Sequence, residues 1–310
     1  MPSASASVAP LTDMRILPRR TRERLIHPYV ELNRKLDVIW DAVNDTRDKL
    51  DRVMGVLRYI HDEDPANRRR LYALRASEEY ELAFTEREPL VSFVVATFDN
   101  HKGLRDVALP SILNQSYSNI EVIVSGDAAP PETAKAVADL GDERVRFINR
   151  TVRGPYPENE EKRWYVLGTP PFNDGASQAR GRWIAHMSDD DAIRPGHTQS
   201  LLEAAREHRF EHCYGRQLVH FPEGDTIELG VFPPAHGQFG TQASIYHSGL
   251  RFFESELGDA MFEVPNDWAL CHRMLRAGVR FGMIDEIVFD KHEHRRNAAD
   301  WAVGRVPEVE

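Results

Sequence analysis

The sequence predicts an α/β domain built on a mostly parallel sheet and preceded by a long N-terminal helix. Three observations predict this class. From residue 89 onward, short β-branched runs alternate with amphipathic helical segments. The first run, "PLVSFVVATF", is continuously apolar, as in strands that are buried on both faces. In residues 29–61, apolar residues recur at spacings of four and three, which indicates a long helix.

The repeat in residues 29–61 is a heptad repeat, typical of a coiled coil. Position a is taken by Leu36, Val43, Leu50 and Leu57, and position d by Leu32, Ile39, Thr46, Val53 and Ile60. Positions e and g add Trp40, Ala42, Met54 and Val56, which makes the apolar stripe broader than a two-stranded seam requires. Two interpretations stay open: self-association into a homo-oligomer through residues 32–60, or packing of this helix on its own α/β domain.

The elements of the α/β domain follow in order along the chain. Strands are expected at 89–98, 119–127, 144–150 and 182–188, and helices at 103–115, 131–141 and 174–181. Residues 213–264 are expected to be rich in strands. Ligands bind parallel sheets at the carboxyl ends of the strands, where Thr97, Asp99, Asp127 and the run "SDDDA" are expected to lie.

The chain is accordingly divided into four segments. Residues 1–28 are expected to be a disordered or basic arm, residues 29–88 a helical coiled-coil oligomerisation segment with a further helix at 66–84, residues 89–298 the α/β domain, and residues 299–310 a tail.

Composition excludes several classes of function. The net charge of -10 argues against general binding of nucleic acid, which requires a cationic surface. No apolar run approaches the roughly 20 residues that span a bilayer, and the first residues lack a hydrophobic signal core. Cys213 and Cys271 have no metal-type spacing, which indicates reduced thiols. We therefore expect a cytoplasmic protein, with a peripheral position on the inner face of the membrane as an alternative.

Three consecutive aspartates, Asp189 to Asp191, follow the apolar stretch "RWIAHM". Carboxylates clustered at a strand end suit a hard divalent cation, Mn²⁺ or Mg²⁺. The sequence has no glycine-rich phosphate loop or dinucleotide fingerprint, so a phosphate-bearing substrate would be held through the metal. In the alternative interpretation, Asp191 and its neighbours cap a helix that starts near Pro195.

Four stretches together carry a resemblance to a known family. They are "VSFVVATFDN", "LPSILNQSYSNIEVIVSGD", "NDGASQARGRWIAHMSDDDAIRPG" and "VPNDWALCHRMLRAGVRFGMID". Over residues 89–295 the chain resembles an inverting family 2 glycosyltransferase with the GT-A fold. The resemblance implies metal-dependent transfer of a sugar from a nucleoside diphosphate donor to an acceptor hydroxyl. UDP is the default donor nucleotide, with GDP and TDP left open, and the acceptor is a carbohydrate, a lipid-linked or a small molecule.

The resemblance also implies roles for matching residues. It assigns nucleotide binding to Thr97, Phe98, Asp99, Asp127, Asn173 and Asp189. It assigns the metal to Asp190 and His292, and the general base to Asp267, which takes the proton of the acceptor hydroxyl. It assigns possible contacts with the acceptor or the diphosphate to Asp191, Trp268, Arg163 and His294.

Structural interpretations remain open for several of these residues. Phe98 can be a core residue, and Asp127 a turn aspartate before "AAPP". Asp267 can simply complement the dipole of the helix that it begins, and His292 can belong to a solvated basic tail.

The sequence departs from the family pattern at several positions, among them Asp99, where relatives more often carry asparagine. Ser188 stands where relatives carry the first acidic residue of the DXD-type motif, and Asn266 stands in place of an acid before the base. Phe172 precedes Asn173, where relatives often carry an arginine. Arg163, Lys162 or Arg153 are candidates for the missing cation.

Two other functions are compatible with parts of the sequence. A sugar-nucleotidyltransferase also combines an α/β sheet, a metal and a nucleotide, but it normally has a glycine-rich basic loop where this chain has "ATFDNHKG". The second alternative is a catalytically inert assembly protein that acts through its coiled coil. Pyrophosphate among the products would identify the first, and absence of donor hydrolysis would identify the second.

Overall fold

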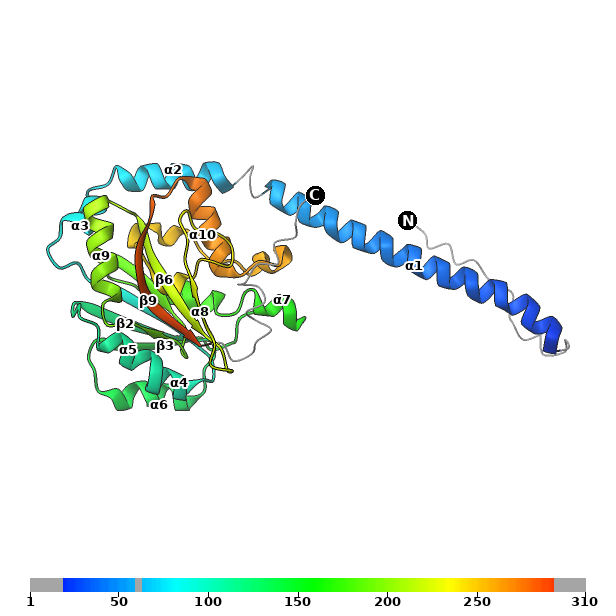
Figure 1. Cartoon of the computed structure of the whole chain (residues 1–310), viewed down its shortest axis with the longest axis horizontal. Helices are drawn as coiled ribbons and strands as arrows, with labels where there is room; N and C mark the ends of the chain where they lie inside the picture. The colour runs from blue at the N-terminus through cyan, green and yellow to red at the C-terminus, as the bar shows by residue number, and fades with distance from the viewer. Residues whose placement is uncertain (1–18, 59–62, 293–310) are drawn as a thin grey trace. The chain divides into compact units, whose positions relative to one another are not determined.

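The computed structural model describes residues 19–58 and 63–292, which form two compact units (Figure 1). The first unit is a single helix, α1 (Arg19–Arg58). It begins at Arg19 rather than at residue 29, so the end of the expected arm is helical. The expected heptad position Ile60, the expected C-terminal tail and His294 lie outside the described residues.

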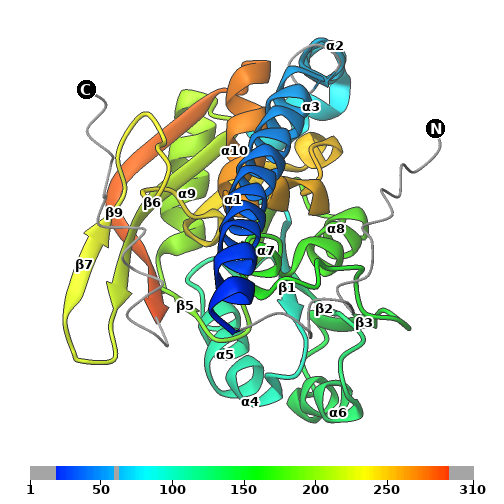
Figure 2. The ribbon, with the colours of Figure 1, turned by 90° about the vertical axis from the view of Figure 1, so that its right-hand side faces the viewer.

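The second unit is built on one mixed sheet (Figure 2). Its strand order is β3-β2-β1-β4-β8-β6-β9-β5, and β7 pairs with β6. The strands are β1 (Val91–Thr97), β2 (Ile120–Gly126), β3 (Val145–Asn149), β4 (Trp183–Met187), β5 (Ala192–Ile193), β6 (His212–His220), β7 (Thr226–Leu229), β8 (Ser244–His247) and β9 (Phe281–His292). Strands β3, β2, β1 and β4 are mutually parallel, β8 runs antiparallel to β4 and β6, and β6 and β9 are parallel. Strands β5 and β7 are antiparallel additions to β9 and β6. The expectation of a mostly parallel sheet with strands at these four sites is confirmed.

Helices cover both faces of the sheet. They are α4 (His101–Gly103), the π-helical turn η3 (Leu104–Ala108) and α5 (Leu109–Leu113) in one continuous segment, followed by α6 (Pro131–Leu140), α7 (Glu160–Trp164), α8 (Thr169–Ser177), α9 (His197–His208) and α10 (Asn266–Ala277). The region expected to be strand-rich holds β6, β7 and β8, together with the short 3₁₀ turns η4 (Thr241–Ala243), η5 (Ser248–Phe252) and η6 (Leu257–Phe262).

Helix α8 lies earlier than the sequence predicted, at 169–177 instead of 174–181. Pro170 and Pro171 occupy its first turn, where proline costs no hydrogen bond and its fixed φ favours the helix. The helix packs closely on β1 because residue 175 is glycine: a Cβ there would lie 2.3 Å from Val94 Cγ1.

Alternate residues of β1 enter two separate cores because successive side chains of a strand point to opposite faces. Phe93 and Val95 belong to the core that also holds Trp183, whereas Val94 belongs to the core that holds Leu270. The strand is therefore buried on both faces, as its continuously apolar sequence predicted.

Residues 64–85 form two helices instead of the single helix expected at 66–84. Helix α2 (Asp64–Arg75) and helix α3 (Glu78–Thr85) are separated by Ala76 and Ser77. Leu71, Tyr80 and Phe84 are buried in the two cores. Both helices therefore pack as part of the compact α/β unit, whereas the sequence placed them with the coiled-coil segment.

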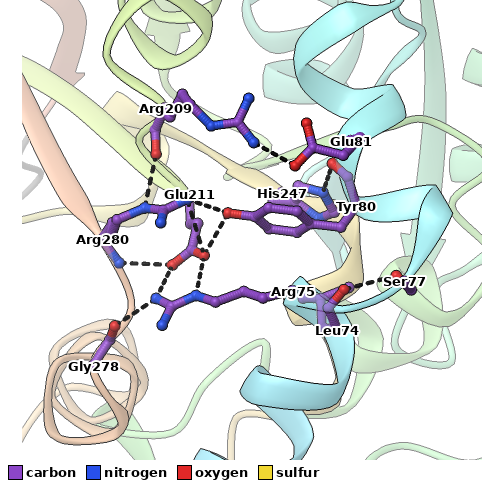
Figure 3. Close-up of polar contacts among 10 residues, drawn as sticks. All are labelled: Leu74, Arg75, Ser77, Tyr80, Glu81, Arg209, Glu211, His247, Gly278 and Arg280. Atoms are coloured by element: carbon purple, nitrogen blue, oxygen red, sulfur yellow. Dashed lines mark hydrogen bonds and ion pairs between the residues drawn. The ribbon is translucent and has the colours of Figure 1, made fainter.

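A buried carboxylate fixes α2 and α3 to the sheet (Figure 3). Glu211 precedes β6 and is fully buried; its two oxygens accept from Arg75 Nε and Nη2 at 2.7 and 2.8 Å. Tyr80 OH donates to the same carboxylate at 2.8 Å, as does the backbone N–H of Arg280, which precedes β9. Burial alone would raise the pKa of Glu211, but the hydrogen bonds from Arg75, Arg280 and Tyr80 lower it overall.

Removing this carboxylate should destabilise the unit strongly. In Glu211→Ala, the Arg75 guanidinium would lose the carboxylate that it binds with two hydrogen bonds. The buried hydroxyl of Tyr80 would lose its hydrogen-bond acceptor. We expect the free energy of unfolding to fall by about 3–5 kcal/mol, measured by urea denaturation. The control is Glu81→Ala, which removes the exposed pair with Arg209 and should cost less than about 1 kcal/mol. Similar small losses in both variants would contradict the role of Glu211 as the anchor.

A second carboxylate makes stability depend on pH. Burial, and then the nearby carboxylate of Glu256, raise the pKa of Glu63 to about 7, although Arg273 opposes the shift. The folded protein therefore binds a proton at the Glu63 carboxylate more tightly than the unfolded chain does. The stability that this proton contributes is lost as the pH rises through about 7.

The variant Glu63→Gln keeps a neutral side chain at every pH. We expect wild type to lose about 1–2 kcal/mol of unfolding free energy relative to this variant between pH 5 and 8. Urea denaturation at several pH values measures the difference. A difference that stays constant across this range would show that Glu63 does not titrate in the folded state.

Candidate active site

The carboxyl ends of β1, β2 and β4 meet at one edge of the sheet. Thr97 pairs with Gly126 at the ends of β1 and β2, and Val95 pairs with Met187 at the end of β4. The register therefore brings the residues that follow these strands together, as the parallel pattern predicted.

Asp189 is the centre of this group. Thr97 Oγ1 donates to one of its oxygens at 2.6 Å, and Asn100 Nδ2 donates to the other at 3.3 Å. Burial, and to a smaller extent the charge of Asp190, raise the pKa of Asp189 to about 6, although the hydrogen bonds from Thr97 and Asn100 oppose the shift. Asp99, to which the resemblance assigned nucleotide binding, is exposed, and the contact with Asp189 comes from Asn100, one residue on.

Asp191 ties the aspartate run to the end of β9. It is buried, and its Oδ1 accepts the backbone N–H of His292 at 2.9 Å. The alternative that these aspartates cap the next helix is wrong. Helix α9 begins at His197 and has Gly196 at its N-cap, without a side-chain cap.

The expected metal site fits in its charge but not in its number of protein ligands. The imidazole of His292 stacks on that of His220, with centroids 4.8 Å apart. Among the described residues, no three His, Cys, Asp or Glu side chains are grouped closely enough to hold a metal ion. The carboxylates of Asp189 and Asp190 suit a hard cation, whose remaining ligands would come from elsewhere.

A second group surrounds Asp127, which follows β2 and is almost fully buried. Its Oδ1 accepts from Gly154 N at 2.9 Å. Arg150 Nε and Arg153 Nε lie 3.7 and 3.8 Å from its oxygens. Burial, and then a hydrogen bond to Asp127, raise the pKa of Tyr156. Residues 150–156 thus fold back over the end of β2.

Arg153 also covers Phe98, with its guanidinium carbon 3.7 Å from the ring centroid. Of the three cations considered for the missing arginine, Arg153 is thus the one found beside Asp127. Arg163 lies on α7 and donates to the carbonyl of Glu158 at 3.2 Å. Sequence reasoning missed Arg150, although it directly follows β3 as Asp127 follows β2.

Phe172 replaces the family arginine with an aromatic stack. Its ring lies parallel to the buried His186, at 4.8 Å between centroids, and His186 Nε2 contacts Tyr246 OH at 3.0 Å. Burial lowers the pKa of His186 to about 4, so this histidine is neutral near pH 7. Asn173 uses both ends of its amide on the backbone of Ser255.

Asp267 lies in the first turn of α10 and lines a cavity of about 320 Å³. Ser188, the first residue of the acidic motif, lines the same cavity. Burial raises the pKa of Asp267, while the backbone N–H of Trp268 and then the charges of Lys291 and His236 oppose the shift. A carboxylate with a raised pKa is a stronger base than an ordinary aspartate.

The aromatic wall of this cavity contains two tryptophans, Trp164 and Trp268. Trp268 packs between His272 and His236, with centroids 5.8 and 5.9 Å away. Trp164 on α7 lines the cavity and is 45% exposed. No sequence pattern marks His236 or Trp164; Lys291 stands one residue before His292.

Comparisons with known proteins agree with this architecture. Residues 171–259 match the family model described as "Glycosyl transferase family 2". The chain is 34% identical over 219 residues to the succinoglycan biosynthesis protein ExoO of Rhizobium meliloti, covering 63% of this chain and 58% of that protein. It is 32% identical over 135 residues to a GalNAc(5)-diNAcBac-PP-undecaprenol beta-1,3-glucosyltransferase of Campylobacter jejuni, covering 42% and 39%. The chain thus spans less than two thirds of the length of these relatives.

Solved structures show the same fold. The S. aureus TarS 1-349 complex with UDP-GlcNAc matches with a TM-score of 0.52 and 14% identity, covering 66% of this chain and 59% of that one. The mannosyltransferase PcManGT from Pyrobaculum calidifontis, in complex with GDP-Man and Mn²⁺, matches with a TM-score of 0.51 and 15% identity, covering 79% and 69%. The expected GT-A type of fold is confirmed.

Proposed function

We propose that this chain, which carries a glycosyl transferase family 2 domain, transfers a sugar from a nucleoside diphosphate donor to an acceptor hydroxyl with inversion. One observation carries the proposal: Ser188 of the acidic motif and Asp267 line the same cavity, beside the edge where Asp127 and Asp189 lie. This arrangement suits a donor held at the sheet edge and an acceptor that enters from the cavity.

The group around Asp127 is the proposed nucleobase site, with Phe98 as its stacking surface. The carboxylate of Asp127 already accepts hydrogen bonds from Gly154 and Tyr156. It is therefore better suited to accept one further N–H from a nucleobase than to accept two. Uracil offers a single N–H between two carbonyl oxygens, and Arg153 can donate to one of these. Thymine offers the same edge, so these contacts support a UDP-sugar or TDP-sugar over a GDP-sugar as the donor. A base that stacks on this face of Phe98 has to displace Arg153.

Asp190 is the proposed ligand of Mn²⁺ or Mg²⁺, with His292 as a second contact. The cation would neutralise the diphosphate and stabilise it as it leaves. Asp189, held by Thr97 and Asn100, is proposed to bind the ribose and to add negative charge that favours the cation. A neighbour in the comparisons, PcManGT, was solved with Mn²⁺, which supports this choice of metal.

Asp267 is the proposed base. Its raised pKa favours removal of the proton from the acceptor hydroxyl as that oxygen attacks the sugar carbon. Asn173 is proposed to position Ser255, which lines the same cavity. Asp191, Trp268 and Arg163 are proposed to shape this side of the site.

The acceptor is proposed to be a carbohydrate or a lipid-linked molecule, since the C. jejuni relative is named for a polyprenyl-diphosphate substrate. Within residues 19–58 and 63–292, no helix is both long and apolar enough to cross a bilayer. We propose a cytoplasmic protein that reaches such an acceptor at the membrane surface.

The first test concerns the metal. In Asp190→Ala, we expect Mn²⁺ to lose its effect on UDP affinity, because the proposed metal ligand is gone. Isothermal titration of UDP with Mn²⁺ and with EDTA measures this. The control Asp106→Ala removes an exposed aspartate that pairs with Arg105, and it should keep the Mn²⁺ effect. An undiminished Mn²⁺ effect in Asp190→Ala would refute the ligand assignment.

The second test concerns the base. We expect Asp267→Asn to bind UDP with unchanged affinity and to release UDP from UDP-sugars at least about 10²-fold more slowly, because the proton acceptor is lost. Release is measured across a panel of UDP-sugars with and without candidate acceptor glycosides. The control is Asp285→Asn, an exposed change on β9. Turnover near that of wild type in Asp267→Asn would remove this residue as the base.

A further inference from the structure

The apolar side chains at the heptad positions of α1 are exposed to solvent. The helix runs without a break from Arg19 to Arg58. Exposed fractions of the stripe residues are 52–60%: Leu32 55%, Leu36 52%, Ile39 58%, Val43 53%, Leu50 60%, Val53 54% and Leu57 53%. A lone helix draws most of its stability in water from burial of such a face, so this stripe requires a partner.

The length of the stripe indicates what the partner is. Residues 32–57 extend over about 38 Å at roughly 1.5 Å per residue. Within residues 63–292, the longest helices have 12 residues, or about 18 Å. None of these can follow the stripe along its length. A helix with a strict seven-residue apolar repeat supercoils with helices that have the same repeat. Other copies of α1 are such helices.

The flanking charges permit copies of α1 to pair in parallel. Position g of one helix then faces position e of the next heptad in its neighbour. The facing pairs are Lys35 with Trp40, Ala42 with Arg47, and Lys49 with Met54. No cation faces another cation in this register. Within each helix, Lys35 and Lys49 are paired with Glu31 and Asp45 at 3.5 and 2.7 Å.

The one polar residue of the described stripe needs no partner across the seam. Thr46 Oγ1 donates to the carbonyl of Ala42 at 2.8 Å, so its hydroxyl is satisfied within its own helix. Its methyl group is then free to pack, and Thr46 acts in the seam as a β-branched residue.

We propose that residues 32–57 of four copies of this chain form a parallel, four-stranded coiled coil. Leucine dominates position a, and β-branched Ile39, Thr46 and Val53 take position d after Leu32, the reverse of the pattern that favours two strands. At position d of a parallel pair, Cβ points directly at the partner, and a branch there crowds it. A bundle of four relieves this crowding and also buries the apolar flanks Trp40 and Met54.

A parallel bundle attaches all four α/β units to one end, since residues 63–292 follow α1 in every copy. If the proposed glycosyl transfer is correct, an acceptor with several hydroxyl groups would meet several sites at a raised local concentration. The bundle itself does not depend on that function, and its tests are independent of activity.

The first experiment measures the mass of the full chain by sedimentation equilibrium. The expected mass is that of four chains of 35.4 kDa each. A mass of one, two or three chains would overturn the proposal.

The second experiment exchanges the two seam positions in the full chain. The variant carries Leu36→Ile, Leu50→Ile and Leu57→Ile at position a, with Ile39→Leu, Thr46→Leu and Val53→Leu at position d. The seam stays apolar, but its pattern now favours two strands, so the expected mass is that of two chains. A mass that stays at four chains would contradict the packing argument. The matched control, Asp41→Ser with Asp48→Ser at position f, should keep four chains.

The third experiment tests orientation. Cys213 and Cys271 are buried, so Leu32→Cys adds one accessible thiol near the start of the stripe. In a parallel bundle these thiols meet, and mild oxidation should link chains in pairs on a non-reducing gel. Absence of such pairs, in a variant whose mass is still four chains, would show that the helices are not parallel.

Discussion

Three parallel strands, β2, β1 and β4, end at the same edge of the sheet, and the register between them determines where the acidic side chains gather. Asp127 and Asp189 are far apart in sequence, but they follow β2 and β4, the two strands that flank β1. Because this edge is largely buried, the carboxylates there interact more strongly than they would in water. Burial, and to a smaller extent the charge of Asp190, raise the pKa of Asp189.

The opposite ends of the strands carry the interactions that stabilise this arrangement. Glu211 and Arg280 precede β6 and β9, which run in parallel toward the edge with His220 and His292. The buried carboxylate of Glu211 is paired there with Arg75. This ion pair is structural, because it joins α2 to the start of β6 at the end of the sheet opposite the candidate site.

Much of the site could be predicted because its residues directly follow predicted strands. Thr97, Asp127 and Asp189 were found in this way, and the structure brings Thr97 and Asp189 into contact. Residues on irregular segments could not be predicted in the same way. Arg153 contacts Phe98 only because residues 150–156 fold back over the end of β2. The conformation of such a loop cannot be predicted from the periodicity of apolar residues.

The sequence by itself determined the class of the fold, the order of the strands along the chain and the heptad repeat of α1, since these depend on local periodicity of apolar residues. Only the tertiary structure decided that α2 and α3 belong to the α/β unit, because their attachment depends on Glu211, distant in sequence. Only the tertiary structure likewise gave Asp191 its partner and packed Trp268 between two histidines. Contacts between distant segments depend on three-dimensional packing, and they leave no periodic signal in the chain.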